Sequence, residues 1–197
     1  MIKHIPLLIV AAGASRRLGR PKQLVELESD LPLLQKLIDI VLSIPMLDVR
    51  VVLGANAEEI QKKIIWKNVR IIHNPNWQQG MGSSISSGIY SLEEKIYSGV
   101  IISVVDQPFL SKAIFERILD KVVLGKEQII LSQYLNGSGP PVYFSGHFFS
   151  ELKKLTGDAG AKPIVSRNRG VIDKMPFDLG HIDIDSEEDL NTYKNIK

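Results

Sequence analysis

Short apolar runs alternate with segments of helical spacing along most of the chain. The run Ile5–Val10 has no polar alternation, which is typical of a strand that is buried on both faces. Further runs predict strands at Val49–Leu53, Val69–His73, Val100–Val105, Gln128–Leu131, Pro141–Phe144, Val171–Met175 and His181–Ile184. Apolar positions three and four residues apart predict helices at Leu33–Ile44, Ala57–Ile64, Ser83–Glu94, Ile114–Val123 and Phe148–Leu155, and from about Glu187.

The alternation of strands and helices predicts an α/β fold. We expect three layers, a Rossmann-like arrangement in which a mostly parallel sheet carries helices on both faces. Neither a repeat nor a linker-like stretch interrupts the pattern, so residues 1–197 are predicted to form a single domain. In open sheets of this kind, ligands bind beyond the carboxyl ends of the strands. Unusual residues at these strand ends are therefore candidates for the site.

Composition narrows the possible functions. Lys and Arg number 24 against 22 acidic residues, and no basic run stands out, so we expect no nucleic-acid partner. The chain has no cysteine, which excludes disulfides, thiol nucleophiles and cysteine-ligated metals. The first apolar run, Ile5–Ala12, contains Pro6 and is too short to span a bilayer. We expect a cytoplasmic protein with no membrane partner.

A turn rich in small and basic residues follows the first strand. Its small residues let the backbone approach a ligand closely, so that free amides can surround phosphate oxygens; they are Ala11, Ala12, Gly13, Ala14 and Ser15. Four cations follow within seven positions: Arg16, Arg17, Arg20 and Lys22. A triphosphate needs both features. The segment is not a Walker A loop, and on its own it is equally consistent with a turn whose arginines are solvated.

A second candidate segment spans residues 74–88. Pro75 and the neighbouring asparagines predict a loop, which leads into a helix that begins near Gly82, Ser83 and Ser84. Hydroxyls and amides at such a position can bind a base edge or a phosphate, although simple capping explains a pair of serines equally well.

Carboxylates occur at two further places. Asp106 ends a predicted strand before Gln-Pro, where the ligand crevice of the sheet opens, although an aspartate there can also simply begin a turn. Mg²⁺ is commonly held by one or two carboxylates together with substrate phosphates, a role that suits Asp106. Near the C-terminus, Ser186 and Asp189 have the spacing of a capping box. Asp185 is our preferred second ligand, with Asp183 as the alternative.

Several of these segments resemble one family. AAGASRRLGRPKQL (residues 11–24) resembles the signature L-A-A-G-x-S-x-R-M-G-x-x-K of nucleotidyltransferases with a MobA-like fold, with Leu18 in place of Met. Residues 74–88 resemble the N-P-x-W-x-x-G-M-x-x-S-L-x-x-G motif of the molybdenum cofactor cytidylyltransferase branch. Asp106-Gln107-Pro108 and residues 183–190 resemble the metal-binding D-Q-P and the D-[IV]-D-T-P-E-D-L segments.

The resemblance implies roles for these residues. The loop at residues 11–17 would wrap the triphosphate, and Lys22 would contact phosphates and stabilise the transition state with Arg16. Gly82, Ser83, Ser84 and Gly88 would read the nucleobase, and the small residue pair Ala11-Ala12 implies a preference for CTP. Asp106 and Asp185 would hold Mg²⁺. The implied partners are a phosphorylated small molecule, namely molybdenum-bound pterin phosphate, and a molybdenum hydroxylase.

The acceptor side is less clear. Gly139-Pro140-Pro141 stands where the family has Gly-His-Pro, so the missing histidine weakens any inference about how an acceptor is held. Leu155–Lys162 resembles L-x-G-D-x-G-A-R and can bind an anionic group or simply separate two helices.

Three alternatives therefore stay open. They are a nucleotidyltransferase with a sugar-phosphate or isoprenoid-phosphate acceptor, an oxidoreductase on the same scaffold, and a non-catalytic cofactor chaperone.

Overall fold

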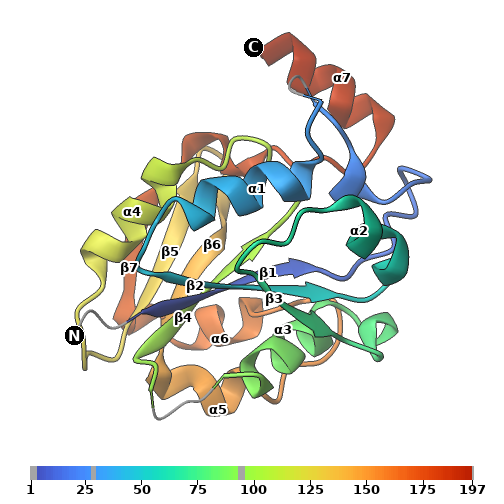
Figure 1. The fold of residues 1–197 in the computed structure, drawn as a ribbon. Coiled ribbons are helices and arrows are strands. Elements are labelled where there is room, and N and C mark those ends of the chain that lie inside the picture. The colour runs from blue at the N-terminus through green and yellow to red at the C-terminus, as the bar shows by residue number, and fades with distance from the viewer. Residues whose placement is uncertain (1–3, 28–29, 93–95, 197) are drawn as a thin grey trace.

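The computed structural model describes residues 4–27, 30–92 and 96–196. The strands are β1 (Ile5–Ala11), β2 (Leu47–Leu53), β3 (Arg70–His73), β4 (Gly99–Val104), β5 (Ile129–Tyr134), β6 (Gly137–Ser145) and β7 (Ile172–Pro176). They form one sheet in the order β3-β2-β1-β4-β6-β5-β7, and among these strands only β6 runs against its neighbours (Figure 1). The mostly parallel sheet expected from the sequence is thus confirmed.

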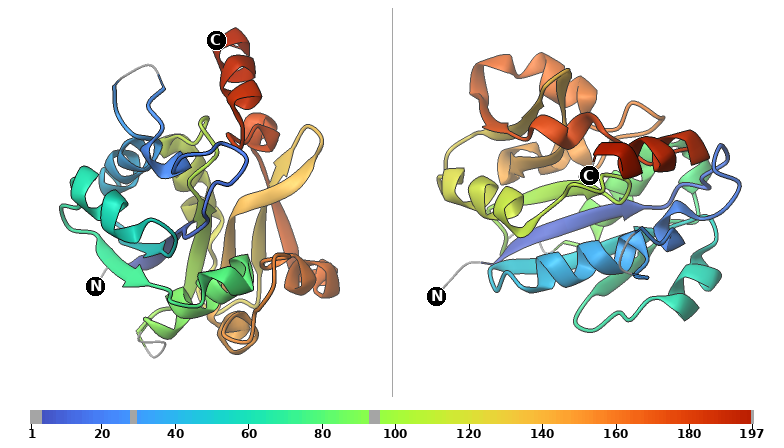
Figure 2. Two further views of the ribbon diagram at one scale, coloured as in Figure 1. Left: turned by 90° about the vertical axis from the view of Figure 1, so that its right-hand side faces the viewer. Right: turned by 90° about the horizontal axis from the view of Figure 1, so that it is seen from above.

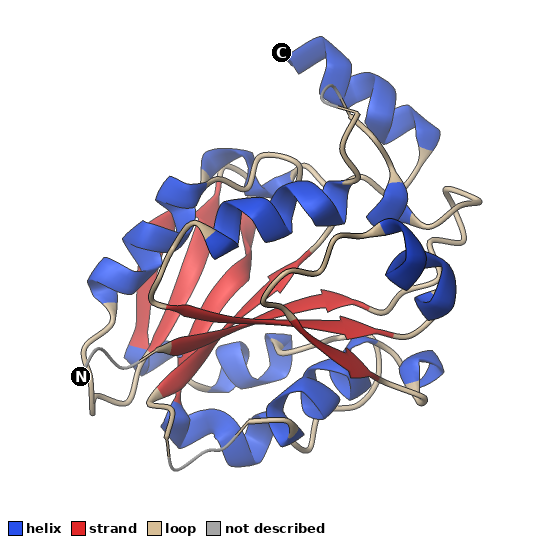
Figure 3. Cartoon of the chain, in the orientation of Figure 1, coloured by secondary structure: helices blue, strands red, loops and turns tan. Residues whose placement is uncertain are grey.

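Helices cover both faces of the sheet, as expected. They are α1 (Leu33–Leu42), α2 (Ala57–Lys63), α3 (Met81–Tyr90), α4 (Lys112–Lys121), α5 (Phe149–Leu152), α6 (Lys162–Arg167) and α7 (Glu187–Ile196). In Figure 3, α1 and α4 lie above the red strands, whereas α3, α5 and α6 lie below them. None of the described helices is both long and apolar enough to cross a lipid bilayer.

Strand β1 lies between two apolar cores. Leu7 and Ile9 belong to the core under α1 and α4, while Leu8 and Val10 point into the core over α3, α5 and α6. Successive side chains of a strand point to opposite faces, so a strand covered on both sides needs apolar residues at every position. The uninterrupted run in the sequence therefore reflects the central place of β1 in the sheet.

The register of the sheet brings two candidate segments together. Parallel strands β1 and β4 pair Val10 with Val104, so the loop after β1 and the loop containing Asp106 leave the sheet side by side. The amide of Ile184 donates to the carbonyl of Asp106 at 2.9 Å, which draws the C-terminal carboxylates to the same edge. Helix α7 stands out from the body next to this edge (Figure 2).

Three elements differ from the sequence prediction. His181–Ile184 is not a strand, because a 3-10 turn over Asp178–His181 leads the chain across the edge of the sheet instead of along it. The short helix α6 was not predicted, because its six residues contain a proline and too few apolar positions to show a period. The helix predicted over Ser83–Glu94 ends at Tyr90, because Ser91 and Leu92 form a turn and a bend; residues 93 and 94 lie outside the described residues.

Candidate functional site

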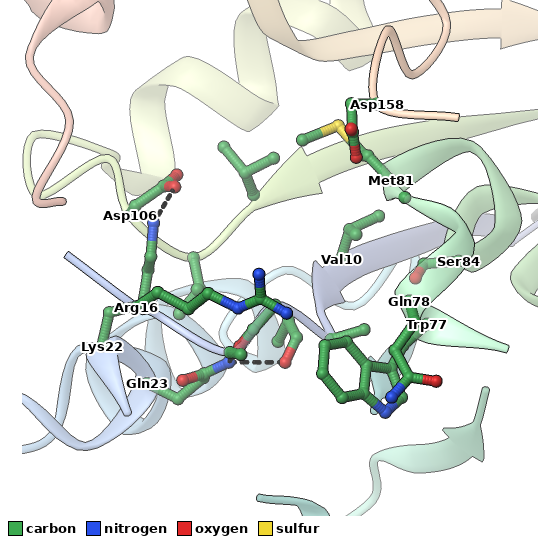
Figure 4. Close-up of a pocket in the computed structure, with 17 residues that line it drawn as sticks. Val10, Arg16, Lys22, Gln23, Trp77, Gln78, Met81, Ser84, Asp106 and Asp158 are labelled. Carbon is green, nitrogen blue, oxygen red and sulfur yellow. Dashed lines mark hydrogen bonds and ion pairs between the residues drawn. The ribbon is translucent and has the colours of Figure 1, made fainter. Parts of the chain in front are cut away.

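A cavity of about 470 Å³ opens beyond the carboxyl ends of β1 and β4. Its lining comes from three loops and the strand ends, and comprises Val10, Ala11, Ala12, Gly13, Ala14, Arg16, Lys22, Gln23, Trp77, Gln78, Gly80, Met81, Ser84, Val104, Val105, Asp106 and Asp158 (Figure 4). Because its position matches the ligand crevice of open α/β sheets, this cavity is the candidate site.

Backbone amides of the loop after β1 form one wall of the cavity. The loop turns at Ser15, whose left-handed backbone (φ 53°) lets its carbonyl accept from Leu18 and Gly19. The amides of Gly13, Ala14, Arg16 and Arg17 have no acceptor within the described residues. Successive unpaired N–H groups at such a turn attract anionic oxygens.

The loop cations differ in their surroundings. Arg17 pairs with Asp185, and Arg20 pairs with Glu187 at 2.8 Å. Arg16 has no carboxylate partner in the described part of the chain, and Figure 4 shows its guanidinium extending into the cavity. A cation that is both unpaired and directed into the cavity can neutralise a bound anion without first breaking an ion pair.

Lys22 lies between two carboxylates. Its Nζ is 2.8 Å from Oδ2 of Asp106 and also contacts Oδ1 of Asp185. Only 13% of the Lys22 side chain is exposed. Burial alone would lower the pKa of Lys22, but the attraction and hydrogen bonds of both carboxylates outweigh it, so this pKa is raised. The ammonium is therefore charged and offsets part of the negative charge of the two carboxylates.

Asp183 lies close to the same pair without contacting Lys22. The surrounding protein partly removes its carboxyl from water, and the charges of Asp106 and Asp185 repel it. Together they raise the pKa of Asp183 to about 6. Three carboxylates thus gather at this edge of the sheet, and the Lys22 ammonium, together with Arg17 at Asp185, compensates for part of their charge.

The carboxylate pair has the chemistry of a divalent cation site. Asp106 and Asp185 already share one cation, the Lys22 ammonium, and Asp106 also faces the cavity. Carboxylate oxygens next to a phosphate-binding loop are the donors that Mg²⁺ prefers. The residues present therefore fit a divalent metal that is completed by ligand phosphates.

The opposite wall is built by residues 74–84. Buried Asn74 donates from Nδ2 to Ser83 and Ser84, at 2.9 and 3.0 Å, and its Oδ1 accepts from the amide of Asn76. This network fixes the loop that presents Trp77 to the cavity (Figure 4). Ser84 lines the cavity as well, and its role in base reading stays a prediction.

Gly82, Ser83 and Gly88 lie behind this wall, away from the cavity. A Cβ on Gly82 would come within 2.6 Å of the Thr156 carbonyl, so glycine permits close packing of two loops. The hydroxyl of Ser83 lies 2.8 Å from the Gly80 carbonyl and closes the turn before α3. Gly88 packs against the side chain of Leu8 in the core. All three residues thus have a packing or turn-forming role in the structure, and none lines the first cavity, although base reading was predicted for them.

A second cavity of about 430 Å³ adjoins the first. The two share Met81, Val104, Asp106 and Asp158. The second is lined mainly by apolar side chains, together with Tyr134, Lys162, Asp183 and residues 138–140 at the start of β6. Both segments considered for an acceptor thus reach one cavity: residues 138–140, which were predicted as a turn but belong to β6, and residues 158–162.

Several lining residues were not predicted. Gln23 and Gln78 are polar residues with no motif of their own, and Tyr134 and Gln107 come together only through the fold, by a 2.9 Å hydrogen bond. Of the predicted residues, 11–14, Arg16, Lys22 and Asp106 line the first cavity, whereas Ser15 and Arg17 of the same loop do not. Asp185 reaches them through Lys22.

Comparison with protein families agrees with this geometry. The family described as MobA-like NTP transferase domain matches residues 7–171. This range includes the loop after β1, the Asn74–Gly88 segment and Asp106, but not Asp183 or Asp185.

Individual relatives and solved structures share about a quarter to a third of their residues with this chain. Nicotine blue oxidoreductase from Paenarthrobacter nicotinovorans is 28% identical over 96% of this chain and 93% of its own length. Purine catabolism protein PucB from Bacillus subtilis is 32% identical over 57% of this chain and 56% of its own. The crystal structure of Rv0371c from Mycobacterium tuberculosis superposes with a TM-score of 0.83 at 25% identity, covering 100% of this chain and 98% of that one. Another structure of Rv0371c is a complex with manganese (TM-score 0.78, 24% identity, 98% of both chains).

Proposed function

The chain belongs to the MobA-like NTP transferase family, and from this premise we propose that it transfers CMP from CTP to the phosphate of a small-molecule acceptor. The observation that carries the proposal is the first cavity, where unpaired loop amides and Arg16 line the same space as the bonded pair of Lys22 and Asp106. Few ligands other than a polyphosphate with a metal ion use anion donors and carboxylates in the same place.

The positive groups of the first cavity would bind the triphosphate of the nucleotide donor. The amides of residues 13–17 bind phosphate oxygens, and Arg16 supplies a mobile cation. Lys22 is charged and can turn from its carboxylates toward the phosphates. Negative charge that develops on the α- and β-phosphates is thereby stabilised in the transition state. No protein nucleophile is needed.

The acceptor occupies the second cavity. An oxygen of its phosphate attacks the α-phosphorus, the bond from that phosphorus to the bridging oxygen breaks, and pyrophosphate leaves. Asp106 and Met81 border both cavities, so donor and acceptor meet there. The main role of the protein is to hold the two reactants next to each other. In phosphoryl transfer, such positioning supplies a large part of the rate enhancement.

Asp106 and Asp185 are the residues that would hold Mg²⁺ or Mn²⁺. A bound divalent ion neutralises phosphate charge and orients the leaving group. The manganese complex of the mycobacterial neighbour supports a divalent metal. Asp185 is preferred over Asp183 because it shares a cation with Asp106.

The nucleotide and the acceptor rest on the sequence resemblance. Ala11-Ala12 and the Asn74–Gly88 motif favour CTP, and the same branch implies molybdenum-bound pterin phosphate as the acceptor. A large, mostly apolar second cavity with Tyr134 and Lys162 at its walls is consistent with a flat, anionic molecule.

The name of the Paenarthrobacter relative favours one rival, an oxidoreductase on this scaffold. The triad of Lys22, Asp106 and Asp185 argues against it, because hydride transfer needs neither a carboxylate-held metal nor a polyphosphate leaving group. Binding of NAD(P)H or flavin with no release of pyrophosphate would favour the oxidoreductase.

Calorimetric titration with CTP, GTP, ATP and UTP, each with and without Mg²⁺, tests the proposal. We expect metal-dependent binding that is tightest for CTP. Asp106→Asn is expected to keep the fold and lose pyrophosphate release. Equal, metal-independent affinity for all four nucleotides would overturn the proposal.

A further inference from the structure

Gln23 is almost completely buried behind the loop after β1. Its side chain lines the first cavity, and 1% of the residue is exposed. Its Nε2 donates to two backbone carbonyls of that loop, Ala11 at 2.6 Å and Gly13 at 3.2 Å. Figure 4 marks the hydrogen bonding of Gln23 with a dashed line. One side chain thus holds two alternate carbonyls of the segment that faces the cavity.

The carbonyl between them is held from another side. The oxygen of Ala12 accepts from the amide of Ala55 at 3.0 Å. All three carbonyls from residue 11 to residue 13 therefore have protein donors, while the amides of Gly13 and Ala14 have no acceptor in the described ranges. Fixing a carbonyl also fixes the peptide plane that follows it, and with it the direction of the next N–H group.

The hydrogen bond from Gln23 matters most at Gly13. A Cβ placed on Gly13 would have no heavy atom within 4 Å, so packing does not hold this residue in place. Glycine also has the widest choice of backbone conformations. Without the bond from Gln23, nothing in the described structure holds the Gly13 carbonyl, and its peptide plane is free to rotate.

Gln23 also has a feature that does not help stability. Its Oε1 is buried and has no hydrogen-bond partner in the described structure. A buried acceptor without a partner costs stability, and an apolar side chain of the same length would avoid that cost. The value of this glutamine therefore lies in its two donors.

We propose that Gln23 is a positioning residue for nucleotidyl transfer. It turns the carbonyls of Ala11 and Gly13 away from the cavity, so that the loop presents amides, not oxygens, to the phosphates. This inference rests on the proposed function, since it needs a polyphosphate at the loop.

Gln35 provides a matched control. It is a glutamine in α1, 4% exposed, and it does not line the first cavity. Both ends of its amide are satisfied: Oε1 accepts from the amide of Ile65 at 2.7 Å, and Nε2 donates to Asp39 and to the Ile65 carbonyl. Its replacement by methionine therefore removes satisfied hydrogen bonds to Asp39 and Ile65, none of which involves the loop after β1.

The test compares Gln23→Met with Gln35→Met in the full chain. Affinities for CTP with Mg²⁺ and for inorganic tripolyphosphate with Mg²⁺ are measured by calorimetry, and melting temperatures by scanning fluorimetry. We expect Gln23→Met to bind both ligands about tenfold more weakly, the factor that one net hydrogen bond represents. The loss is shared by tripolyphosphate because the loop holds phosphates and not the base. Gln35→Met is expected to lose more in melting temperature and to keep wild-type affinities.

Other results would overturn the inference. These are unchanged affinity in Gln23→Met, failure of that variant to fold, a loss confined to CTP, or an equal loss of affinity in Gln35→Met. If the wild-type protein binds neither ligand, the proposed function itself fails. If the wild type binds and Gln23→Met binds equally well, only the role of Gln23 fails.

Discussion

Replacing Lys22 by methionine separates its two roles, because it removes the ammonium but keeps the length of the side chain. In the structure that ammonium lies 2.8 Å from Asp106 and contacts Asp185. The exposed fraction of the side chain is 13% for Lys22, 21% for Asp106 and 30% for Asp185. Loss of the ammonium leaves Asp106 without an ion-pair partner among the described residues, while Asp185 keeps only Arg17. We therefore expect the variant to be less stable as well as inactive.

The size of the effect follows from partial burial. Breaking a fully buried ion pair costs about 3–5 kcal/mol, whereas an exposed pair contributes about 0–1 kcal/mol. The Lys22 cluster lies between these limits, so we expect the free energy of unfolding at pH 7 to fall by about 1–3 kcal/mol. Since the pKa of Lys22 is raised, the ammonium contributes fully at pH 7. This contribution is lost only as the pH rises beyond the ordinary lysine value of 10.5.

The assay is urea unfolding at pH 7 with and without Mg²⁺ and without nucleotide. If the carboxylates hold a divalent cation, Mg²⁺ takes the place of the ammonium, so it should stabilise Lys22→Met more than wild type. Lys63→Met is the control, because Lys63 pairs with Glu59 at 3.0 Å on an exposed surface. It should cost less than about 0.5 kcal/mol and show no metal effect. Equal costs for the two variants, or equal stabilisation of wild type and Lys22→Met by Mg²⁺, would refute the reasoning.

Two further variants test the surroundings of the site. The folded-state pKa of Asp183 is about 6 against an ordinary 3.8, so the folded protein binds more protons and loses stability as pH rises through that window. Asp183→Asn should remove this loss, measured as melting temperature at pH 4 and 7; an unchanged pH dependence would contradict the cause we give. Gly88→Ala should cost about 1–3 kcal/mol in urea unfolding, because its methyl group would overlap Leu8, with no change in nucleotide affinity. If Gly88→Ala instead lost nucleotide affinity without losing stability, the result would support a role of Gly88 in base reading.

Much of the fold could be predicted because local pattern and tertiary environment agree. β1 is apolar at every position because both its faces are covered, and this is visible in the sequence. The prediction for His181–Ile184 was wrong because its apolar residues pack at the edge of the sheet without pairing as a strand. The path of this segment depends on Asp106, whose carbonyl accepts from the amide of Ile184. Asp106 and Ile184 are too far apart in the sequence for a local pattern to show this contact.

In the site, too, some residues could be predicted from the sequence and others could not. Lys22 and Asp106 were predictable because strand ends meet at one edge of a parallel sheet. Gln23 was not, since a glutamine after a lysine has no distinctive pattern and its importance lies in two carbonyls it happens to reach. Gly88 matched a motif yet packs in the core, because a small residue can be required by a neighbouring side chain as well as by a ligand.

A crystal structure with CTP and a divalent cation tests the central claim most directly. We predict the triphosphate along the amides of residues 13–17 and the cation on Asp106 and Asp185. The Lys22 ammonium should have moved from these carboxylates to the phosphates. A nucleotide bound elsewhere, or a lysine that still bridges the two aspartates beside a bound triphosphate, would contradict the account.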